Sequence, residues 1–238
     1  MMLKMNMPLY GDGKGFVELV DAVGSDLSVV NSARVSFGKH KTELDDKDKK
    51  LIKYLIRHKH TSTLEHCFVT FRVKVPLFVR SQHHRHRTWS YNEISRRYTD
   101  FDIQFYEPKA FRTQHKSNRQ ASNAEELINP KVSFMWDESI TGYDAALAMK
   151  ELHEGALYLF ECMIEAGVCR EQARGVLPQN MYTEYYASAN LNNILKFIDL
   201  RTHEGAQKEI QDMAKGMLEI ITKLYPVTVG AYREIRGH

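Results

Sequence analysis

Residues 67–76 read CFVTFRVKVP, and this stretch indicates the central strand of the fold. Successive side chains of a strand point to opposite faces, so a period of two predicts one buried face and one exposed face. The apolar set falls on alternate positions: Cys67, Val69, Phe71, Val73 and Val75. The other face carries Phe68, Thr70, Arg72 and Lys74. Pro76 ends the strand and is well placed to be the first residue of a following helix.

The pattern on either side of this strand predicts an α+β protein. Residues 15–22 (GFVELVDA) form a second alternating strand, followed by a short helix that Asp26 or Ser28 caps and that runs to Ala33. Residues 182–187 read as a third strand. Apolar spacing predicts helices around 51–56, 142–166, 170–177, 190–201 and 210–224, the last ended by Pro226. We therefore expect one domain over residues 1–238, with a central, mostly antiparallel sheet flanked by helices.

One segment departs from this regularity. Residues 112–130 are polar and have no apolar period, which predicts a flexible loop.

Composition narrows the class of protein. The 238 residues include 33 Lys and Arg against 30 Asp and Glu, a net charge of +3, and 43% are hydrophobic. These values fit a globular protein that binds small anions, and they are too weakly basic to require a nucleic acid partner. No stretch has the roughly 18 apolar residues of a membrane span. Three cysteines without a CxxC pair indicate buried free thiols and a cytoplasmic location.

The chemistry is concentrated in residues 82–98, QHHRHRTWSYNEISRRY. Arginines follow one another closely there, with Arg80 just before the segment and Glu93 as its one carboxylate. Such a density of positive charge favours an anionic ligand, and the planar guanidinium group suits phosphate. Ser95, followed by Arg96 and Arg97, is typical of a monophosphate site.

Three other interpretations of this segment stay open on residues alone. It could be a solvated charged face, although Trp89 and Tyr91 are not needed on one. It could be a metal site, but the spacings of the histidines match no zinc motif and the arginines repel a dication. The segment 80–98 could also belong to a nucleotide- or RNA-binding module, although no nucleic-acid signature accompanies it.

A family resemblance favours one interpretation. Arg85-His86-Arg87, seven residues and then Ser95 resemble the RHR-x7-S signature of the flavin-dependent thymidylate synthases, and residues 92–98 (NEISRRY) extend the likeness. Further blocks follow in the family's order: residues 15–21, 33–37, 64–66, 173–178 and 200–201. The resemblance covers nearly the whole chain, and residues 112–130 are the least matched part.

The resemblance implies an enzyme that converts dUMP to dTMP. Methylenetetrahydrofolate would supply the carbon, NADPH would reduce a bound FAD, and a homotetramer would share its active sites between subunits. It implies FAD contacts from His60, Ser62, Arg85, His86, Arg87, Glu93, Asn190, Leu191, Asn192 and Lys196. It implies dUMP contacts from Gln82, His83, His84, Arg85, Glu93, Ile94, Ser95, Arg96, Arg97, Arg174 and Arg201. No metal is implied, and Arg201 would be the catalytic residue that stabilises the anionic pyrimidine ring.

Two positions depart from the family pattern. Where relatives often carry Arg and then Asn four residues later, this chain has Asn192 and Lys196, which a helix keeps on one face. Gly205 stands where relatives often carry His.

Single residues also have purely structural interpretations. Asn190 could be a helix N-cap, Glu93 could balance Arg97, and Trp89 and Tyr98 could be core aromatics. None of the three cysteines lies in a motif suited to a nucleophile, so none is expected to act as one.

Overall fold

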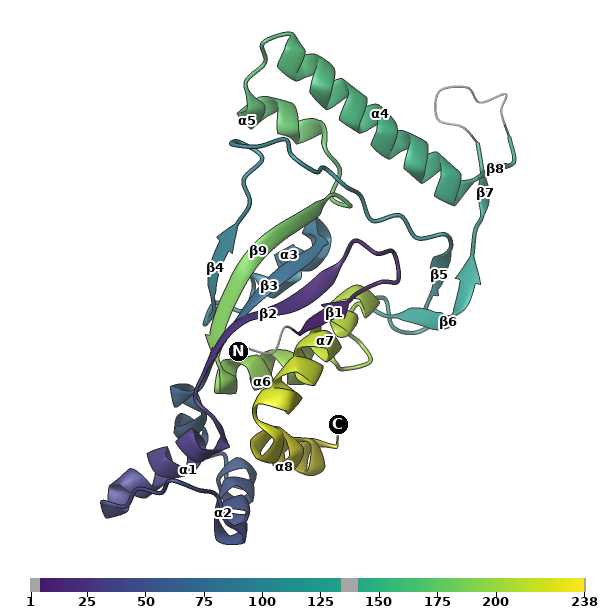
Figure 1. Ribbon diagram of the computed structural model, residues 1–238. Coiled ribbons are helices and arrows are strands. Elements are labelled where there is room, and N and C mark those ends of the chain that lie inside the picture. The colour runs from purple at the N-terminus through teal and green to yellow at the C-terminus, as the bar shows by residue number, and fades with distance from the viewer. Residues whose placement is uncertain (1–4, 134–140, 238) are drawn as a thin grey trace.

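The computed structural model describes residues 5–133 and 141–237 (Figure 1). Its strands are β1 (Asn6–Pro8), β2 (Phe16–Val23), β3 (Phe68–Pro76), β4 (Ser90–Glu93), β5 (Phe111–Gln114), β6 (Ser122–Ile128), β7 (Lys131–Val132), β8 (Tyr143–Asp144) and β9 (Tyr182–Asn190). Its α-helices are α1 (Asp26–Arg34), α2 (Asp46–Arg57), α3 (Leu77–His83), α4 (Ala145–Glu165), α5 (Arg170–Ala173), α6 (Leu191–Arg201), α7 (Lys208–Leu224) and α8 (Pro226–Arg236). Short 3-10 turns are η1 (Val35–Phe37), η2 (Thr61–His66) and η3 (Arg174–Val176).

A five-stranded antiparallel sheet in the order β1-β2-β3-β9-β4 forms the centre of a single α+β domain. The strand predicted at residues 67–75 is its middle strand, β3. The apolar face of that strand is fully buried, as predicted, and it pairs with inward residues of β9 such as Tyr185 and Ala187. On the opposite face Arg72 lies across from Tyr186, which is 49% exposed. One face of the sheet is therefore core, and the other is polar and open in the single chain.

Helices α3, α6 and α7 cover the buried face of the sheet, because α3 and α6 each contact both β9 and α7. Strand β3 runs directly into α3, and its neighbour β9 runs directly into α6. Because β3 and β9 are antiparallel, their C-terminal ends lie at opposite ends of the strand pair. The helices that follow them, α3 and α6, therefore run back toward each other. Nine strand residues span about 30 Å, and helices of 11 and seven residues span about 16 and 10 Å. The C-terminal ends of α3 and α6 therefore meet beneath the sheet.

Figure 1 places α1, α2 and α8 at one end of the molecule and α4 and α5 at the other. The cap predicted for α1 is corrected: its N-cap is Ser25, which forms a capping box with Ser28. Asp26 instead caps α8, because its carboxylate accepts hydrogen bonds from the amides of Val227 and Thr228 at 3.0 and 2.8 Å. This buried carboxylate joins two helices at opposite ends of the sequence.

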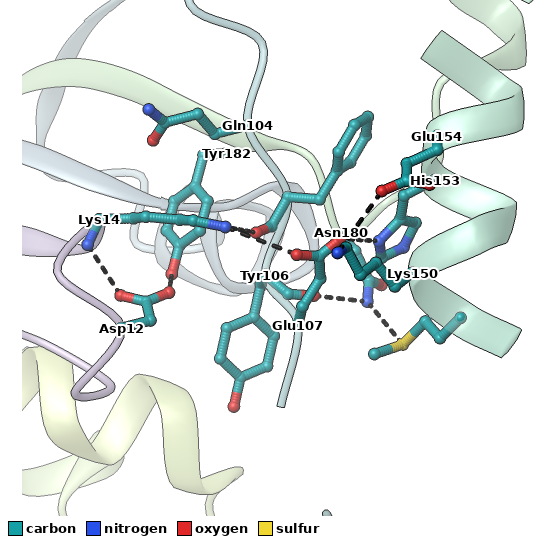
Figure 2. Close-up of polar contacts among 12 residues, drawn as sticks. Asp12, Lys14, Gln104, Tyr106, Glu107, Lys150, His153, Glu154, Asn180 and Tyr182 are labelled. Carbon is teal, nitrogen blue, oxygen red and sulfur yellow. Dashed lines mark hydrogen bonds and ion pairs between the residues drawn. The ribbon is translucent and has the colours of Figure 1, made fainter. Parts of the chain in front are cut away.

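Polar contacts fasten the long helix α4 to the N-terminal part of the sheet (Figure 2). Lys14, in the turn between β1 and β2, donates to the carbonyl of Phe105 at 2.8 Å and lies 3.6 Å from the carboxylate of Glu107. The other oxygen of Glu107 is 3.0 Å from Nδ1 of His153 on α4, and the His153 ring stacks on Phe105. The segment between β4 and β5 is thus held on both sides, and α4 is held with it.

The structure corrects four further expectations. Residues 112–130 are not an irregular loop, because most of them belong to the antiparallel β5–β6 hairpin. Pro226 ends α7 as predicted but also begins α8, which the sequence did not indicate. Cys169 is exposed, whereas Cys67 is buried. Tyr98 is 80% exposed and is not a core residue, whereas Trp89 is 7% exposed and is one.

No helix in the ranges 5–133 and 141–237 is long and apolar enough to cross a membrane.

Candidate active site

The basic motif begins at the end of α3 and continues through a tight turn into β4. The amide of His86 donates to the carbonyl of His83 at 2.9 Å, and the Tyr91 hydroxyl reaches the carbonyl oxygens of both histidines at 2.9 and 3.0 Å. This turn leaves Arg85 and Arg87 exposed. Within the described residues neither guanidinium forms an ion pair. The turn therefore presents two uncompensated positive charges.

Arg201, the last residue of α6, meets this turn where the ends of α3 and α6 converge. Its Nε donates to Nε2 of His86 at 3.1 Å, and its Nη2 donates to the carbonyl oxygen of Gln82 at 3.1 Å. The Gln82 side chain in turn donates to the side-chain oxygen of Gln207, at the start of α7. Burial lowers the pKa of Arg201. The fold thus brings together residues that are far apart in sequence.

Glu93 at the end of β4 has partners on both neighbouring elements. Arg80 Nε donates to its Oε1 at 3.0 Å, and the Thr183 hydroxyl donates to the same oxygen at 2.6 Å. The expected pairing of Glu93 with Arg97 is wrong, because Arg97 lies 3.5 Å from Glu171 instead. The carboxylate of Glu93 is held rigidly beside the motif.

The loop after β4 carries Ser95 and Arg97 next to α5. Ser95 Oγ accepts from the amide of Arg97 at 3.3 Å, so Ser95 closes a turn over residues 96–98. Ion pairs from Arg97 to Glu171 (3.5 Å) and from Arg170 to Asp100 (3.0 Å) fasten α5 to this loop. Arg174 directly follows α5 and is exposed. The loop and Arg174 are therefore on neighbouring segments.

Two predicted site residues point into the protein. The Arg96 side chain is 7% exposed and donates to the carbonyl oxygens of Phe101 and Asp102, at 2.6 and 3.4 Å. His83 is completely buried, and its Nδ1 lies 2.9 Å from the Tyr185 hydroxyl. Burial lowers the pKa of His83, so its imidazole is neutral.

Two other predicted site residues, His84 and Ile94, are only partly buried. The His84 ring packs against Tyr91 in a tilted arrangement, with ring centroids 4.1 Å apart and 34° between the planes. The Ile94 amide donates to the carbonyl of Glu184 at 2.9 Å.

A second group of predicted residues gathers at the N-terminal end of α6. Asn190 caps this helix by accepting from the Asn193 amide at 2.9 Å, and Leu191 is buried. Asn192 donates to Glu65 in η2 at 3.0 Å. Exposed His60 and Ser62 in the adjoining turn line a cavity of about 770 Å³.

Asn192 and Lys196 share one face of α6, as predicted, and both line a cavity of about 210 Å³. Lys59 and Arg236 line the same cavity. The sequence did not indicate these two cations, because neither belongs to the motif and Arg236 lies at the far end of the chain. The unusual feature of Lys59 is its positive φ of 56°, which the sequence alone does not show.

Comparisons with known proteins identify the family. Residues 18–227 match the family model described as thymidylate synthase complementing protein. The flavin-dependent thymidylate synthase of Thermus thermophilus is 42% identical over 221 residues, which cover 93% of this chain and 76% of the relative. That of Kosmotoga olearia is 40% identical and covers 92% of this chain and 90% of the relative. The chain belongs to the flavin-dependent thymidylate synthase family.

Solved structures agree with the fold. The UMP/dUMP methylase PolB of Streptomyces cacaoi, bound with 5-Br dUMP, superposes with a TM-score of 0.77 at 32% identity. The match covers 96% of this chain and 97% of that one. Membership of the family also removes the non-enzymatic binding module as an interpretation of residues 80–98.

Proposed function

We propose that this flavin-dependent thymidylate synthase methylates dUMP with carbon from methylenetetrahydrofolate, using bound FAD and electrons from NADPH. The observation that carries the proposal is the contact of Arg201 with the motif turn. A half-buried guanidinium without a carboxylate partner in the described residues is bonded to His86, and the residues on either side of His86 in the sequence are the exposed arginines Arg85 and Arg87. This arrangement suits an anionic nucleotide whose ring becomes more negative during reaction.

The donor set fits FAD. The dinucleotide carries a pyrophosphate, and this chain has no Gly-rich Rossmann segment, so side chains must supply the positive charge. Arg85 and Arg87 supply it at the motif turn, and His86 adds a donor. Lys196, in the middle of α6, supplies it around the 210 Å³ cavity together with Lys59, whereas Arg236 in the same lining is 4.0 Å from the carboxylate of Asp199.

We assign further flavin contacts to the turn that precedes β3 and to the start of α6. His60 and Ser62 line the 770 Å³ cavity beside this turn. Asn190 and Leu191 contribute their backbone, since the Asn190 side chain is used as the helix cap. Asn192 is already bonded to Glu65, which leaves Lys196 to take over the charge that relatives carry at position 192.

We assign the nucleotide to the other side of the motif. Ser95, Arg97 and Arg174 bind the phosphate, because they are polar or cationic, accessible and on adjoining segments. Gln82, Arg85, Glu93, His84 and Ile94 line the sugar and base. Arg96 and His83 are left out of this set, because the first is bonded to loop carbonyls and the second has no exposed surface. Both instead give the loop and the turn their shape.

Arg201 is the catalytic group of this proposal. Methylation at C5 of uracil requires more electron density on the ring, and a guanidinium at the ring's polar edge stabilises the resulting negative charge. When bound, the flavin supplies the hydride that completes the methyl group. A thiolate at Cys67 is not available as a nucleophile, since burial raises the pKa of that thiol to about 11 and keeps it protonated.

We also infer a homotetramer with shared sites, in the cytoplasm. The outer face of the sheet supports the assembly, because it leaves Phe68 and Tyr186 each 49% exposed. Three free cysteines support a reducing compartment.

The test is direct. Purified protein should be yellow and release FAD on denaturation, and it should form dTMP from dUMP, methylenetetrahydrofolate and NADPH. UMP serves as the second substrate in the same assay, because the Streptomyces relative is described as a UMP/dUMP methylase. A colourless protein that takes up no flavin and forms neither methylated product contradicts the proposal.

A further inference from the structure

The hydrogen bond between Arg201 and His86 fixes the protonation state of the imidazole. Arginine only donates hydrogen bonds, so Nε2 of His86 must accept and its proton must sit on Nδ1. A protonated imidazolium has no free lone pair and cannot make this bond. The contact therefore requires neutral His86 in a single tautomer.

The imidazole is held against α6 from two sides. Its ring packs edge-on against Phe197, with centroids 4.9 Å apart and an angle of 81° between the planes. Phe197 and Arg201 are four residues apart on α6, so they occupy the same face of the helix. The backbone of His86 is fixed as well, by its bond to His83 and by the Tyr91 hydroxyl. Ring and guanidinium thus form one rigid unit.

This unit uses only one edge of the Arg201 guanidinium. Nε donates to His86 and one Nη2 hydrogen donates to the Gln82 carbonyl, which leaves both Nη1 hydrogens and the other Nη2 hydrogen. Two of the remaining hydrogens lie side by side on a neighbouring edge. They match a pair of adjacent acceptors such as a ring carbonyl and a deprotonated ring nitrogen.

We propose that His86 is a positioning residue, whose neutral imidazole orients the guanidinium of Arg201 so that its free edge meets the pyrimidine ring. The inference rests on the proposed function of Arg201 and assigns His86 a task beyond contact with FAD. It predicts that an acceptor at the Nε2 position, rather than the imidazole itself, is what the reaction needs from this side chain.

Two variants separate these requirements. In His86→Gln the side-chain oxygen can reach the Nε2 position, whereas in His86→Asn the side chain ends near the Nδ1 position. We expect His86→Gln, which restores the acceptor, to be the faster of the two variants in the single-turnover oxidation of pre-reduced flavin by saturating dUMP and folate. We expect His86→Asn to fall by about 10- to 100-fold, as when one fixed donor to a developing charge is lost. His115→Gln, at a partly exposed histidine between β5 and β6, is the matched control.

Fluorescence titration measures the affinity of each variant for FAD and gives the concentration that saturates it. Loss of a cofactor contact lowers that affinity, whereas the proposal predicts a difference in rate between the two variants that persists at saturating FAD. Equal rates for the two variants at saturating FAD would overturn it. A wild-type protein that binds FAD but forms no dTMP would instead show that the proposed function has failed.

A second measurement does not depend on turnover. Nitrogen-15 NMR of the histidine-labelled wild-type holoenzyme at pH 7 reports the tautomer of each imidazole. The expected result is one histidine locked with its proton on Nδ1, whose signal changes in Arg201→Lys and is absent from His86→Gln. A His86 signal showing protonated Nε2 would contradict the proposed contact.

Discussion

The Nε of Arg80 on α3 lies 3.0 Å from Oε1 of Glu93 at the end of β4, and the Thr183 hydroxyl donates to the same oxygen. This ion pair is half-buried, and it joins the helix that precedes the motif turn to the strand that follows it. The two ends of the turn are therefore clamped to each other and to β9.

Glu93→Ala should destabilise the protein by about 1–3 kcal/mol, because Arg80 and Thr183 lose a partner in a partly buried position. Urea unfolding of the flavin-free protein measures the change. Arg80→Met with Glu93→Met is the control, since removal of both charges should recover part of the loss. A double variant as unstable as Glu93→Ala would mean that the unpaired Arg80 guanidinium is not the cause of the loss.

Substitutions at Arg201 and at Arg97 should change different kinetic parameters. Arg201→Ala should lower the rate of flavin oxidation at saturating dUMP by about 10²–10³, because a group that stabilises charge on the ring is lost. Arg201→Lys should also be impaired, since it keeps the charge without the planar fork. Arg97→Ala should mainly raise KM for dUMP, as expected for a phosphate contact. If Arg201→Ala reacts at the normal rate once saturated, Arg201 is a binding residue.

Replacement of all three cysteines should leave turnover intact. Cys67→Ala removes a buried thiol that donates to the Ser25 carbonyl at 3.7 Å, so the cost should be a modest loss of stability. Cys162→Ser and Cys169→Ser change accessible positions and should cost little. The triple variant is assayed for dTMP formation and for its melting temperature. A folded, flavin-bound triple variant without turnover would show that a thiol takes part.

The β5–β6 hairpin should depend on Glu209 of α7. This carboxylate is 4% exposed and accepts from Arg112 of β5 at 2.7 and 2.9 Å and from the Tyr106 hydroxyl at 3.1 Å. Glu209→Ala leaves a partly buried guanidinium unpaired and should cost about 3 kcal/mol. Hydrogen exchange should accelerate across residues 111–128 more than in β3. Arg112→Met with Glu209→Leu should restore much of the stability.

Acid should lower the stability of the folded protein through His86. Burial and Arg201 lower its pKa from 6.5 to about 4 in the folded state. Between these values the unfolded chain binds a proton that the folded chain does not, so this group makes stability fall as pH drops from 6.5 toward 4. His86→Gln lacks the titrating group and should lose less stability over that window. Denaturant unfolding at about pH 7 and about pH 5 measures the difference, and equal losses in both proteins would contradict it.

The sheet and its core were predictable, because their information is local. The alternation in residues 67–75 is sufficient to specify the buried face of β3, and helical spacing is sufficient for α7. The β5–β6 hairpin was not predictable, since its exposed polar strands have no apolar period and its anchor, Arg112, has its partner on α7. Helix α8 was missed because Pro226 was taken only as a stop, although proline also suits the first turn of a helix.

The candidate site, like the fold, was predictable from the sequence only in part. The sequence indicated the basic turn and Arg201, because both match an ordered pattern of residue types. It did not indicate that Arg96 and His83 are buried, since arginine is seldom buried and the partners of the two side chains are loop carbonyls or a distant residue. Lys59 and Arg236 were missed because they meet Lys196 only in the folded chain.

Asn190 is both the last residue of β9 and the N-cap of α6, so no flexible joint separates the central strand from the helix that ends at Arg201. A helix of 11 residues attached in this way is a rigid continuation of the strand. Its tip can shift only if the sheet itself distorts. Any opening that admits or releases a ligand near Arg201 must therefore come from rotation of side chains or from movement of residues 202–207, which follow the helix. The backbone of Arg201 itself stays in place.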